Sequence, residues 1–561
     1  MPHCEKRRTR KRGPNHVSTE APTLDKRKSM PPRGKSAAAL ASVAILALLV
    51  HGWIAAYDYY ATTFTDSMDY LFMADFYRMH FYGGGSESVL AYYRGTRFPP
   101  LFPLILGALG AGSEQQHVAS ILSNAIAVAA SLAVWRWTRV ETGSPWLAAG
   151  FAGALVLQPY FFVLNLSPVS EPLGVLLTAS VFALVASTEV ARSRILLAAL
   201  LAGLAPLARA ALLPLPIALL VWLACRRKSL PRPSGLAGIA CVLSLFPYAG
   251  WYAYRRLLGA QQYEDFLPES SGDGSWHGVV GEIGIEVGTR VVRLVRAAHD
   301  LWCADPGTWT WVPVSLLIAA AATGCALRMR HGRADAWFLA GYVTLILLWP
   351  FPNEYRRFLI LAYPAVLLCA WHAMDALFQR TDTAKAAQAA AALLATLVVT
   401  ASLPSWQRFV HRAQMDVDDA LLGEKREPGF FLQPTDGGAM AVTEAFGRAR
   451  LLLMEADSVL PQGACIYSSP TQFARLYGKR ASVEYPGDLG SDSERARSEL
   501  TTCDWFFVSS WGASAYGLPA AYPSKALEGW TEPLLMSRFS PEHGGGLAAA
   551  LVRRRDAEDG H

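Results

Sequence analysis

The residues with the clearest potential for chemistry are acids in an aromatic-rich segment that follows the first apolar stretch. The segment reads YDYYATTFTDSMDYLFMADFYRMHFYGGG, and its carboxylates are Asp58, Asp66, Asp69 and Asp75. If the chain after Thr65 is helical, Asp66 and Tyr70 share one face at i and i+4, with Asp69 beside them at i+3. A carboxylate partly desolvated by aromatic rings could accept a proton from an acceptor group. The structural alternative is that Thr65 or Asp66 only caps a helix.

A second acid, Glu171, lies in the segment LSPVSEPLGVLL, next to Pro172. Acids and prolines are both common in the first turn of a helix, so Glu171 could be no more than a favourably placed helix-start residue. As a functional group it could orient Asp66 or share a divalent cation with it. Two carboxylates are too few to assign a metal.

Three arginines lie where a cation needs an explanation. Arg209 is in the strongly apolar stretch LAGLAPLARAALLPLP, where it needs an anion or an aqueous cavity. A lipid phosphate would be such an anion, and snorkelling to a headgroup is the alternative. Arg356 and Arg357, in PFPNEYRRFLIL, could clamp a phosphate through bidentate hydrogen bonds. The plain alternative for both is a salt bridge to Glu354 together with headgroup contact.

The elements that hold these residues are predicted to be membrane helices. Of the 561 residues, 52% are hydrophobic and 17% are charged, and the mean hydropathy is +0.22, which indicates lipid as the main solvent. Recurring apolar stretches predict about eleven helices. They lie at 37–56, 116–135, 146–163, 172–187, 195–207, 210–225, 235–252, 309–327, 336–350, 359–377 and 386–403. The pair broken by Pro206 and Arg209 could be kinked or re-entrant.

The positions of Lys and Arg predict the orientation. Segment 1–35 is basic and nearly free of aliphatic residues, so we expect a disordered cytoplasmic tail. Alternate short loops within the membrane domain 36–404 carry the next basic residues, as cytoplasmic loops should. The first loop, 57–100, is then extracytoplasmic. Because much of the net charge of +6 lies in the tail and these loops, it does not indicate a nucleic-acid partner.

Beyond the last apolar stretch, segment 405–561 is expected to be an extracytoplasmic α/β domain. The strand-like runs ACIYSS, ASVEY and DWFFVSS alternate with helical runs, which is typical of a parallel sheet. Cys465 and Cys503 could pair in an oxidising compartment or remain two buried thiols. The sequence contains no CxxC pair, P-loop, dinucleotide fingerprint, GxSxG or HExxH, which argues against nucleotide-driven transport and hydrolase chemistry.

Several of these segments resemble the GT-C glycosyltransferases. The likeness is to the branch with the protein mannosyltransferases, the aminoarabinose transferases of lipid A and the RgtA/B/C/D-like membrane glycosyltransferases. Its most specific part runs from Asp66 to Pro103: an Asp just after the first span, a Tyr four residues on, and then PPLFPLILGALG. The Ser170–Glu171 turn, the Arg209 region and NEYRRFLILAYPAVLL are also similar.

The resemblance implies a mainly α, polytopic GT-C-type membrane protein of about eleven spans with a small C-terminal α/β domain. It implies transfer of a hexose or pentose from a polyprenyl-phosphate-linked donor to a glycan, lipid or protein acceptor, at the outer face of a bacterial plasma membrane. Asp66 would be the base of an inverting displacement. Glu171 could bind a sugar hydroxyl, and Arg209, Arg356 and Arg357 could bind the donor phosphate. Many family members have Asp-Glu where this chain has Asp66-Ser67, so the task of that Glu is unfilled or falls to Asp69.

Two other classes of function stay open at this point. A polytopic transporter would place the buried Arg and the outer acids along a substrate path, but the sequence shows no internal repeat. A non-catalytic GT-C-like assembly protein would keep the fold without the chemistry.

Overall fold

The computed structural model describes most of the chain between residues 33 and 555. The described ranges are 33–56, 65–82, 98–187, 190–226, 233–257, 276–302, 310–349, 354–379, 385–415, 436–469, 471–483, 485, 492–510, 524–541 and 545–555. Almost all of the expected tail 1–35 and much of the first loop 57–100, including Asp58, lie outside the described residues.

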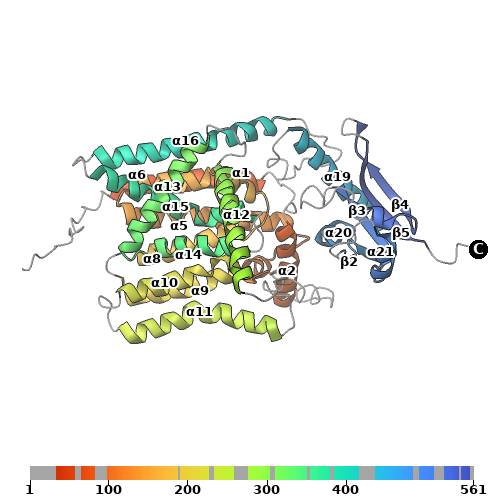
Figure 1. Cartoon of the computed structure of the whole chain (residues 1–561), viewed down its shortest axis with the longest axis horizontal. Helices are drawn as coiled ribbons and strands as arrows, with labels where there is room; N and C mark the ends of the chain where they lie inside the picture. The colour runs from red at the N-terminus through yellow and green to blue at the C-terminus, as the bar shows by residue number, and fades with distance from the viewer. Residues whose placement is uncertain are drawn as a thin grey trace, which may run out of the picture.

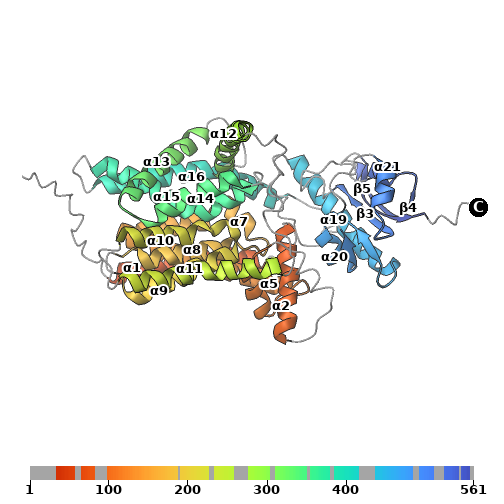
Figure 2. The same ribbon diagram turned by 60° about the horizontal axis from the view of Figure 1, so that its bottom comes forward.

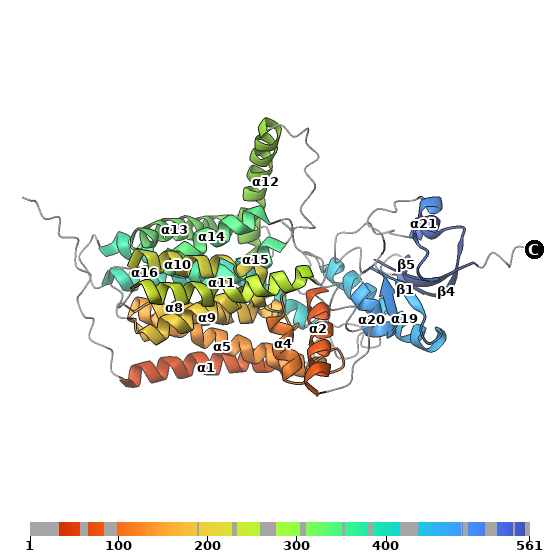
Figure 3. The same ribbon diagram turned by 90° about the horizontal axis from the view of Figure 1, so that it is seen from below.

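Most of the described chain is a bundle of helices that lie side by side (Figure 1). The bundle and the elements beside it comprise α1 (Arg33–Ala56), α2 (Thr65–Tyr82), α4 (Leu101–Ala108), α5 (Gln116–Thr142), α6 (Pro145–Val156), α7 (Pro159–Leu164), α8 (Glu171–Val185), α9 (Arg192–Ala208), the 3-10 helix η1 (Ala210–Leu212), α10 (Pro214–Arg226), α11 (Pro233–Leu257), α12 (Trp276–Trp302), α13 (Trp311–Arg330), α14 (Ala334–Leu348), α15 (Tyr355–Gln379) and α16 (Lys385–Ala413). Figure 3 shows α12 projecting sideways from this bundle.

Six helices of the described chain are long and apolar enough to cross a membrane: α1, α5, α11, α13, α15 and α16. Shorter apolar helices accompany them at 145–156, 171–185, 210–226 and 334–348. The chain is therefore an integral membrane protein. Each apolar stretch predicted from the sequence contains helix, and the stretch 146–163 is divided between α6 and α7. The number of eleven spans stays a prediction.

Small residues let helices in the bundle approach closely. A Cβ added to Gly324 in α13 would collide with the backbone carbonyl of Cys369 in α15, and one added to Gly203 in α9 would collide with that of Leu243 in α11. Close backbone approach at small residues is the usual way in which helices gain packing energy in lipid, where burial of apolar surface gives little.

A buried group of charges joins helices at one end of the bundle. Arg328 in α13 binds Glu141 of α5 at 3.0 Å and Asp335 of α14 at 2.5 Å, and Arg333 pairs with the same Glu141. Because each acid is paired with a guanidinium, the charges satisfy one another. We call this the far end of the bundle, because α2 lies at the other.

Helix α2 lies crosswise between the bundle and the C-terminal sheet (Figure 2). Its Asp75 accepts hydrogen bonds from the backbone N–H of Ser113, at 3.2 Å to each carboxylate oxygen, and from the Ser113 hydroxyl. The Tyr82 hydroxyl donates to the carbonyl oxygen of Ala108 at 2.7 Å. These bonds fix α2 to α4 and to the turn that follows α4. The helix predicted after Thr65 is thus present as α2.

The C-terminal part is a five-stranded sheet with helices, in the strand order β2-β1-β3-β5-β4. Its elements are α19 (Asp436–Val459), β1 (Cys465–Tyr467), α20 (Thr471–Gly478), β2 (Ala481–Val483), α21 (Ser493–Glu499), β3 (Trp505–Ser509), α23 (Ser524–Leu527), β4 (Thr531–Arg538) and β5 (Leu547–Arg554). The three strands expected from the sequence form the parallel half, in which β1 pairs with β2 and β3. The antiparallel pair β4 and β5 was not predicted, so the sheet is mixed.

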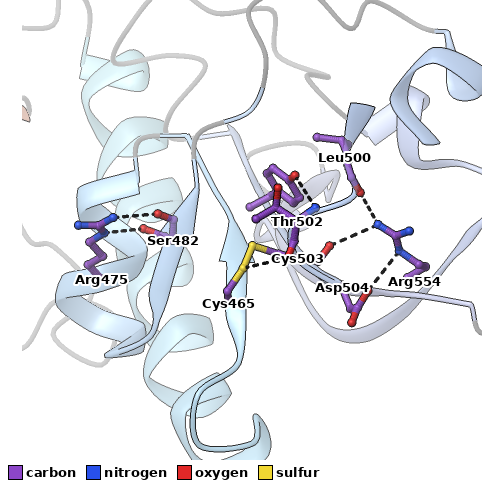
Figure 4. The surroundings of a disulfide bond; sticks show 9 residues. Cys465, Arg475, Ser482, Leu500, Thr502, Cys503, Asp504 and Arg554 are labelled. Carbon is purple, nitrogen blue, oxygen red and sulfur yellow. Dashed lines mark hydrogen bonds and ion pairs between the residues drawn. A yellow bond between two sulfur atoms is a disulfide. The ribbon is translucent and has the colours of Figure 1, made fainter. Parts of the chain in front are cut away.

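A disulfide joins Cys465 at the start of β1 to Cys503, just before β3 (Figure 4). The same view shows Arg554 of β5 bonded to the carbonyl of Leu500 and to Asp504. Of the two alternatives left open by the sequence, the structure therefore has the bridged pair rather than two thiols.

Candidate active site

Charged residues from four separate segments meet at the end of the bundle next to α2. They are Asp66 in the first turn of α2, Glu171 at the start of α8, Arg209 between α9 and η1, and Glu354 with Arg357 at the start of α15. We call these five residues the charge cluster. The structure thus brings together four positions singled out from the sequence, together with Glu354.

Arg357 lies at the centre of the charge cluster. Its Nη1 lies 2.7 Å from Oδ2 of Asp66, its Nη2 lies 3.3 Å from Oε2 of Glu171, and its Nε also bonds Glu171. A guanidinium offers donors in a fixed fork, so one Arg can hold two carboxylates at a defined separation. Arg357 therefore sets the position of Asp66 relative to Glu171.

Arg209 completes the cluster from the opposite side of Glu171. The residue is extended, with φ −157° and ψ 123°, at the point where α9 ends and the chain turns through η1 into α10. Its Nη1 lies 2.7 Å from Oε1 of Glu171, and its guanidinium lies over the ring of Phe358 at 4.8 Å. The Pro-marked stretch around Arg209 is thus a break between two helices, which delivers the cation to the cluster.

Tyr70 shares the cluster face of α2 with Asp66, as their spacing predicts. Its hydroxyl lies 2.9 Å from Oγ of Ser170, which also accepts a hydrogen bond of 3.4 Å from Arg209. Burial, and then the negative charge of Asp66, raise the pKa of Tyr70 far above its ordinary value. Tyr70 therefore stays neutral, and its role here is to hold the Ser170–Glu171 turn through one hydrogen bond.

Asp69 points away from the charge cluster. Both of its carboxylate oxygens accept from Nε2 of Gln472 in α20, at 3.0 and 3.2 Å. Asp69, which the resemblance offered as a replacement for the missing Glu, therefore contacts the C-terminal domain. Ser67, which stands at the position of that Glu, is fully buried.

Arg356 also lies apart from the carboxylates of the cluster. Its guanidinium lies 4.4 Å from the ring centroid of Tyr160 in α7. The neighbouring Arg357 is almost fully buried, whereas Arg356 is half-buried. Of the two adjacent cations predicted to clamp a phosphate, Arg357 is bound to carboxylates and Arg356 to an aromatic face.

Glu354 is the exposed member of the cluster. Its Oε2 lies 3.7 Å from Nη2 of Arg209 and 3.7 Å from Nη1 of Arg357, and its side chain is 40% exposed. Its contacts are longer than those of Asp66 and Glu171, whose side chains are 12% and 0% exposed. A solvated acid loosely bound to two cations is the anion that an incoming ligand can replace most easily.

The position between Asp66 and Glu171 is occupied by the guanidinium of Arg357, which leaves no place for a metal ion between these two acids. No group of three or more His, Cys, Asp or Glu side chains within the described ranges could hold an ion. Asp66 and Glu171 are both bound to Arg357, so a cation shared by them would have to displace a guanidinium that already supplies the positive charge.

Two residues of this region were not singled out from the sequence as functional. The sequence indicates Glu354 only as a salt-bridge partner of the adjacent arginines and indicates no role for Gln472. The NEYRR spacing carried the signal for Glu354, because residues three apart meet on a helix. No local signal exists for Gln472, since its partner Asp69 is far away in the sequence.

No family model matches the chain, and no curated protein matches it. Among solved structures, the chain is similar to the archaeal oligosaccharyltransferase AglB from Archaeoglobus fulgidus in complex with an inhibitory peptide and a dolichol-phosphate. The TM-score is 0.48 and the identity 11%, over 91% of this chain and 74% of that chain. The apo form of the Archaeoglobus fulgidus oligosaccharyltransferase gives 0.46 and 12%, over 92% and 74%. AglB is a GT-C superfamily glycosyltransferase.

Proposed function

We propose that this chain is a membrane glycosyltransferase that moves a sugar from a polyprenyl-phosphate-linked donor to an extracytoplasmic acceptor. The observation that carries the proposal is the charge cluster itself. It places a carboxylate, Asp66, and two guanidiniums at one end of a membrane bundle. A base for the acceptor and cations for the donor phosphate are the groups that such a transfer needs.

Asp66 acts as the general base in this proposal. An acceptor hydroxyl attacks the anomeric carbon of the donor, its proton moves to a carboxylate oxygen of Asp66, and the bond from that carbon to the phosphate oxygen breaks. The electron pair leaves with the lipid phosphate, and the configuration inverts. Arg357 holds one oxygen of Asp66 at 2.7 Å, so the other oxygen is the one that would face the acceptor.

The leaving phosphate is stabilised by the arginines. Arg209 and Arg357 already share Glu354 as a loose partner at 3.7 Å, and a donor phosphate would take the place of that carboxylate. Arg356, next to Arg357 on α15, would add a third cation. Glu171 stays between Arg209 and Arg357 and keeps both forks aimed at the same point.

The disulfide indicates on which side of the membrane the C-terminal domain lies. Disulfides persist in oxidising compartments and are rare in the cytosol. The Cys465–Cys503 bridge therefore supports a C-terminal domain outside the cytoplasm. The charge cluster lies at the end of the bundle that adjoins this domain, so the reaction would take place at the outer face.

The test compares Asp66→Asn with a matched variant in the full-length protein. The matched variant is Asp335→Asn, which also removes a buried carboxylate from an arginine pair, but at the far end of the bundle. We expect Asp66→Asn to lower transfer by about 10²- to 10⁴-fold, the usual range for a general base, while Asp335→Asn lowers only stability. Mass spectrometry of envelope glycans and polyprenyl-phosphate sugars is the measurement.

The outcomes separate the competing classes of function. Accumulated donor and a missing sugar in the Asp66→Asn strain support a transferase and identify both substrates. Unchanged transfer with normal expression would show that Asp66 is not the base. Equal effects of Asp66→Asn and of Asp335→Asn on the glycans would favour an assembly protein.

A further inference from the structure

Helix α2 is held between two different environments. Asp66 and Tyr70 face the charge cluster, whereas Met68 is 0% exposed and packs in the hydrophobic core of the C-terminal domain with Phe446 and Phe473. Positions 66 and 68 are about 200° apart around a helix, so they lie on nearly opposite faces. The helix that carries the proposed base is therefore also part of the core of the C-terminal domain (Figure 2).

Polar contacts reinforce this apolar one. Asp69 is 5% exposed, and Gln472 of α20 donates to both of its carboxylate oxygens at 3.0 and 3.2 Å. A buried carboxylate that loses its donor is costly, so this contact strongly favours one position of α2 against α20.

Helix α20 is itself fixed within the C-terminal domain. Phe473 is fully buried, and Arg475 binds Ser482 of β2 through its hydroxyl at 3.2 Å and its carbonyl at 3.0 Å (Figure 4). β2 in turn pairs with β1, which the disulfide ties to the segment before β3. A rigid chain of contacts therefore runs from the sheet through α20 to α2.

We propose that the C-terminal domain positions the catalytic base, and that Gln472 is a positioning residue for Asp66. This inference rests on the proposed function, because it assigns Asp66 a reaction to be positioned for. Asp69 is one helical turn or less from Asp66, so a shift of α2 at Asp69 moves Asp66 against Arg357. The domain is then a working part of the active site as well as a cover over it.

The test uses an isosteric exchange of donor and acceptor in the full-length protein. Gln472→Glu keeps the shape of the side chain but places a carboxylate against Asp69. Asp69→Asn combined with Gln472→Glu restores a donor–acceptor pair with the direction reversed. We expect the single variant to lower transfer by about 10- to 100-fold, as misplacement of a reacting group does, and the double variant to recover most of this loss.

Hydrogen exchange of residues 65–82 gives a readout that does not depend on activity. Gln472→Glu should speed exchange in α2, and the double variant should slow it again. The matched control is Asp457→Asn, which breaks an ion pair with Arg480 inside the same domain without touching α2. It should leave both transfer and exchange in α2 near those of the unmodified protein.

Each outcome decides between the two proposals. If Gln472→Glu leaves transfer and exchange unchanged while Asp66→Asn abolishes transfer, the positioning role is overturned and the proposed function stands. Failure of the double variant to recover transfer, with the protein folded, also overturns the positioning role. If exchange responds as expected but Asp66→Asn leaves transfer intact, the contact between the domain and α2 stands and the base assignment falls.

Discussion

Arg357 joins Asp66 to Glu171: one guanidinium lies 2.7 Å from the first carboxylate and bonds the second through two nitrogens. The three residues come from α15, α2 and the start of α8, so the contact exists only when the bundle is assembled. Two acids and a cation that are almost fully buried are stable together, but each would be costly alone. The geometry of the proposed base therefore depends on an arginine far from it in the sequence.

Replacing Arg357 by Lys should therefore damage both activity and stability. Lys keeps the charge but has no planar fork, so it cannot hold Asp66 and Glu171 together. We expect transfer to fall by about 100-fold, as it does when a reacting group is misplaced. Unfolding free energy should fall by about 3 kcal/mol or more, as when a buried ion pair is broken. Transfer kinetics and thermal unfolding in detergent are the measurements.

The control for this change is the adjacent arginine. Arg356→Lys keeps a cation near Tyr160, outside the contacts with Asp66 and Glu171. Stability should be nearly unchanged, and any loss should appear as a raised KM for the lipid donor rather than a lowered kcat. Equal stability losses for the two variants would contradict the central place of Arg357.

Neutralising Glu354 should strengthen donor binding, whereas the arginine variants above should weaken transfer or donor binding. Its carboxylate competes with a donor phosphate for Arg209 and Arg357, at 3.7 Å from each. In Glu354→Gln both cations lose this competitor, so the KM for the donor should fall by about two- to fivefold, which is the size of a partly exposed ion pair. Steady-state kinetics over a range of donor concentrations measure it. A raised KM would mean that Glu354 assists donor binding instead.

The sequence predicted the helices of the bundle well, because lipid leaves few alternatives to a helix for a long apolar stretch. It also placed Asp66 and Tyr70 on one face, since i,i+4 spacing decides this locally. The antiparallel strand β5 was missed because LAAALVRR is rich in Ala, which is depleted in strands. Its place beside β3 comes from tertiary pairing, which local propensity cannot supply.

In the candidate site, too, local signals were found in the sequence, and contacts between distant segments were not. Arg209 was recognised because a buried charge stands out in an apolar segment, and Glu171 because it follows Ser170 and precedes Pro172 at a helix start. Their partners were not predicted: the sequence offered Arg357 a phosphate or Glu354, whereas the structure also pairs it with Asp66 and Glu171. The contact of Gln472 with Asp69 joins the two ends of the sequence, and a polar residue in a soluble helix carries no sign of such a partner.

Removing the disulfide should loosen the C-terminal domain. The Cys465–Cys503 bridge closes a loop between positions 38 residues apart, and a loop of this size is worth about 3–4 kcal/mol when the bridge is unstrained. Cys465→Ser combined with Cys503→Ser should lower resistance of the domain to proteolysis in urea by a matching amount. Cys225→Ser, which removes a free exposed thiol, is the control and should have no effect. Unchanged resistance in the double variant would show that the bridge does not stabilise the domain.

Asp75 should make the attachment of α2 depend on pH. Burial raises the pKa of Asp75, although the hydrogen bonds from Ser113 and the nearby charge of Arg78 partly offset this, and Glu114 adds to it. An acid whose pKa is higher in the folded state binds its proton more tightly there. Its contribution to stability is therefore fully present below the unfolded pKa of about 3.8 and is lost as the pH rises through the folded value.

Asp75→Asn removes this titration and keeps an acceptor for the Ser113 N–H. The thermal midpoint of Asp75→Asn minus that of the unmodified protein should therefore increase between pH 4 and pH 7. Ser113→Ala should act in the other direction, because it removes a hydrogen bond that lowers the pKa of Asp75, and the loss of stability with rising pH should become larger. Thermal unfolding in detergent across this pH range measures both. Parallel curves for all three proteins would mean that Asp75 does not titrate differently in the folded state.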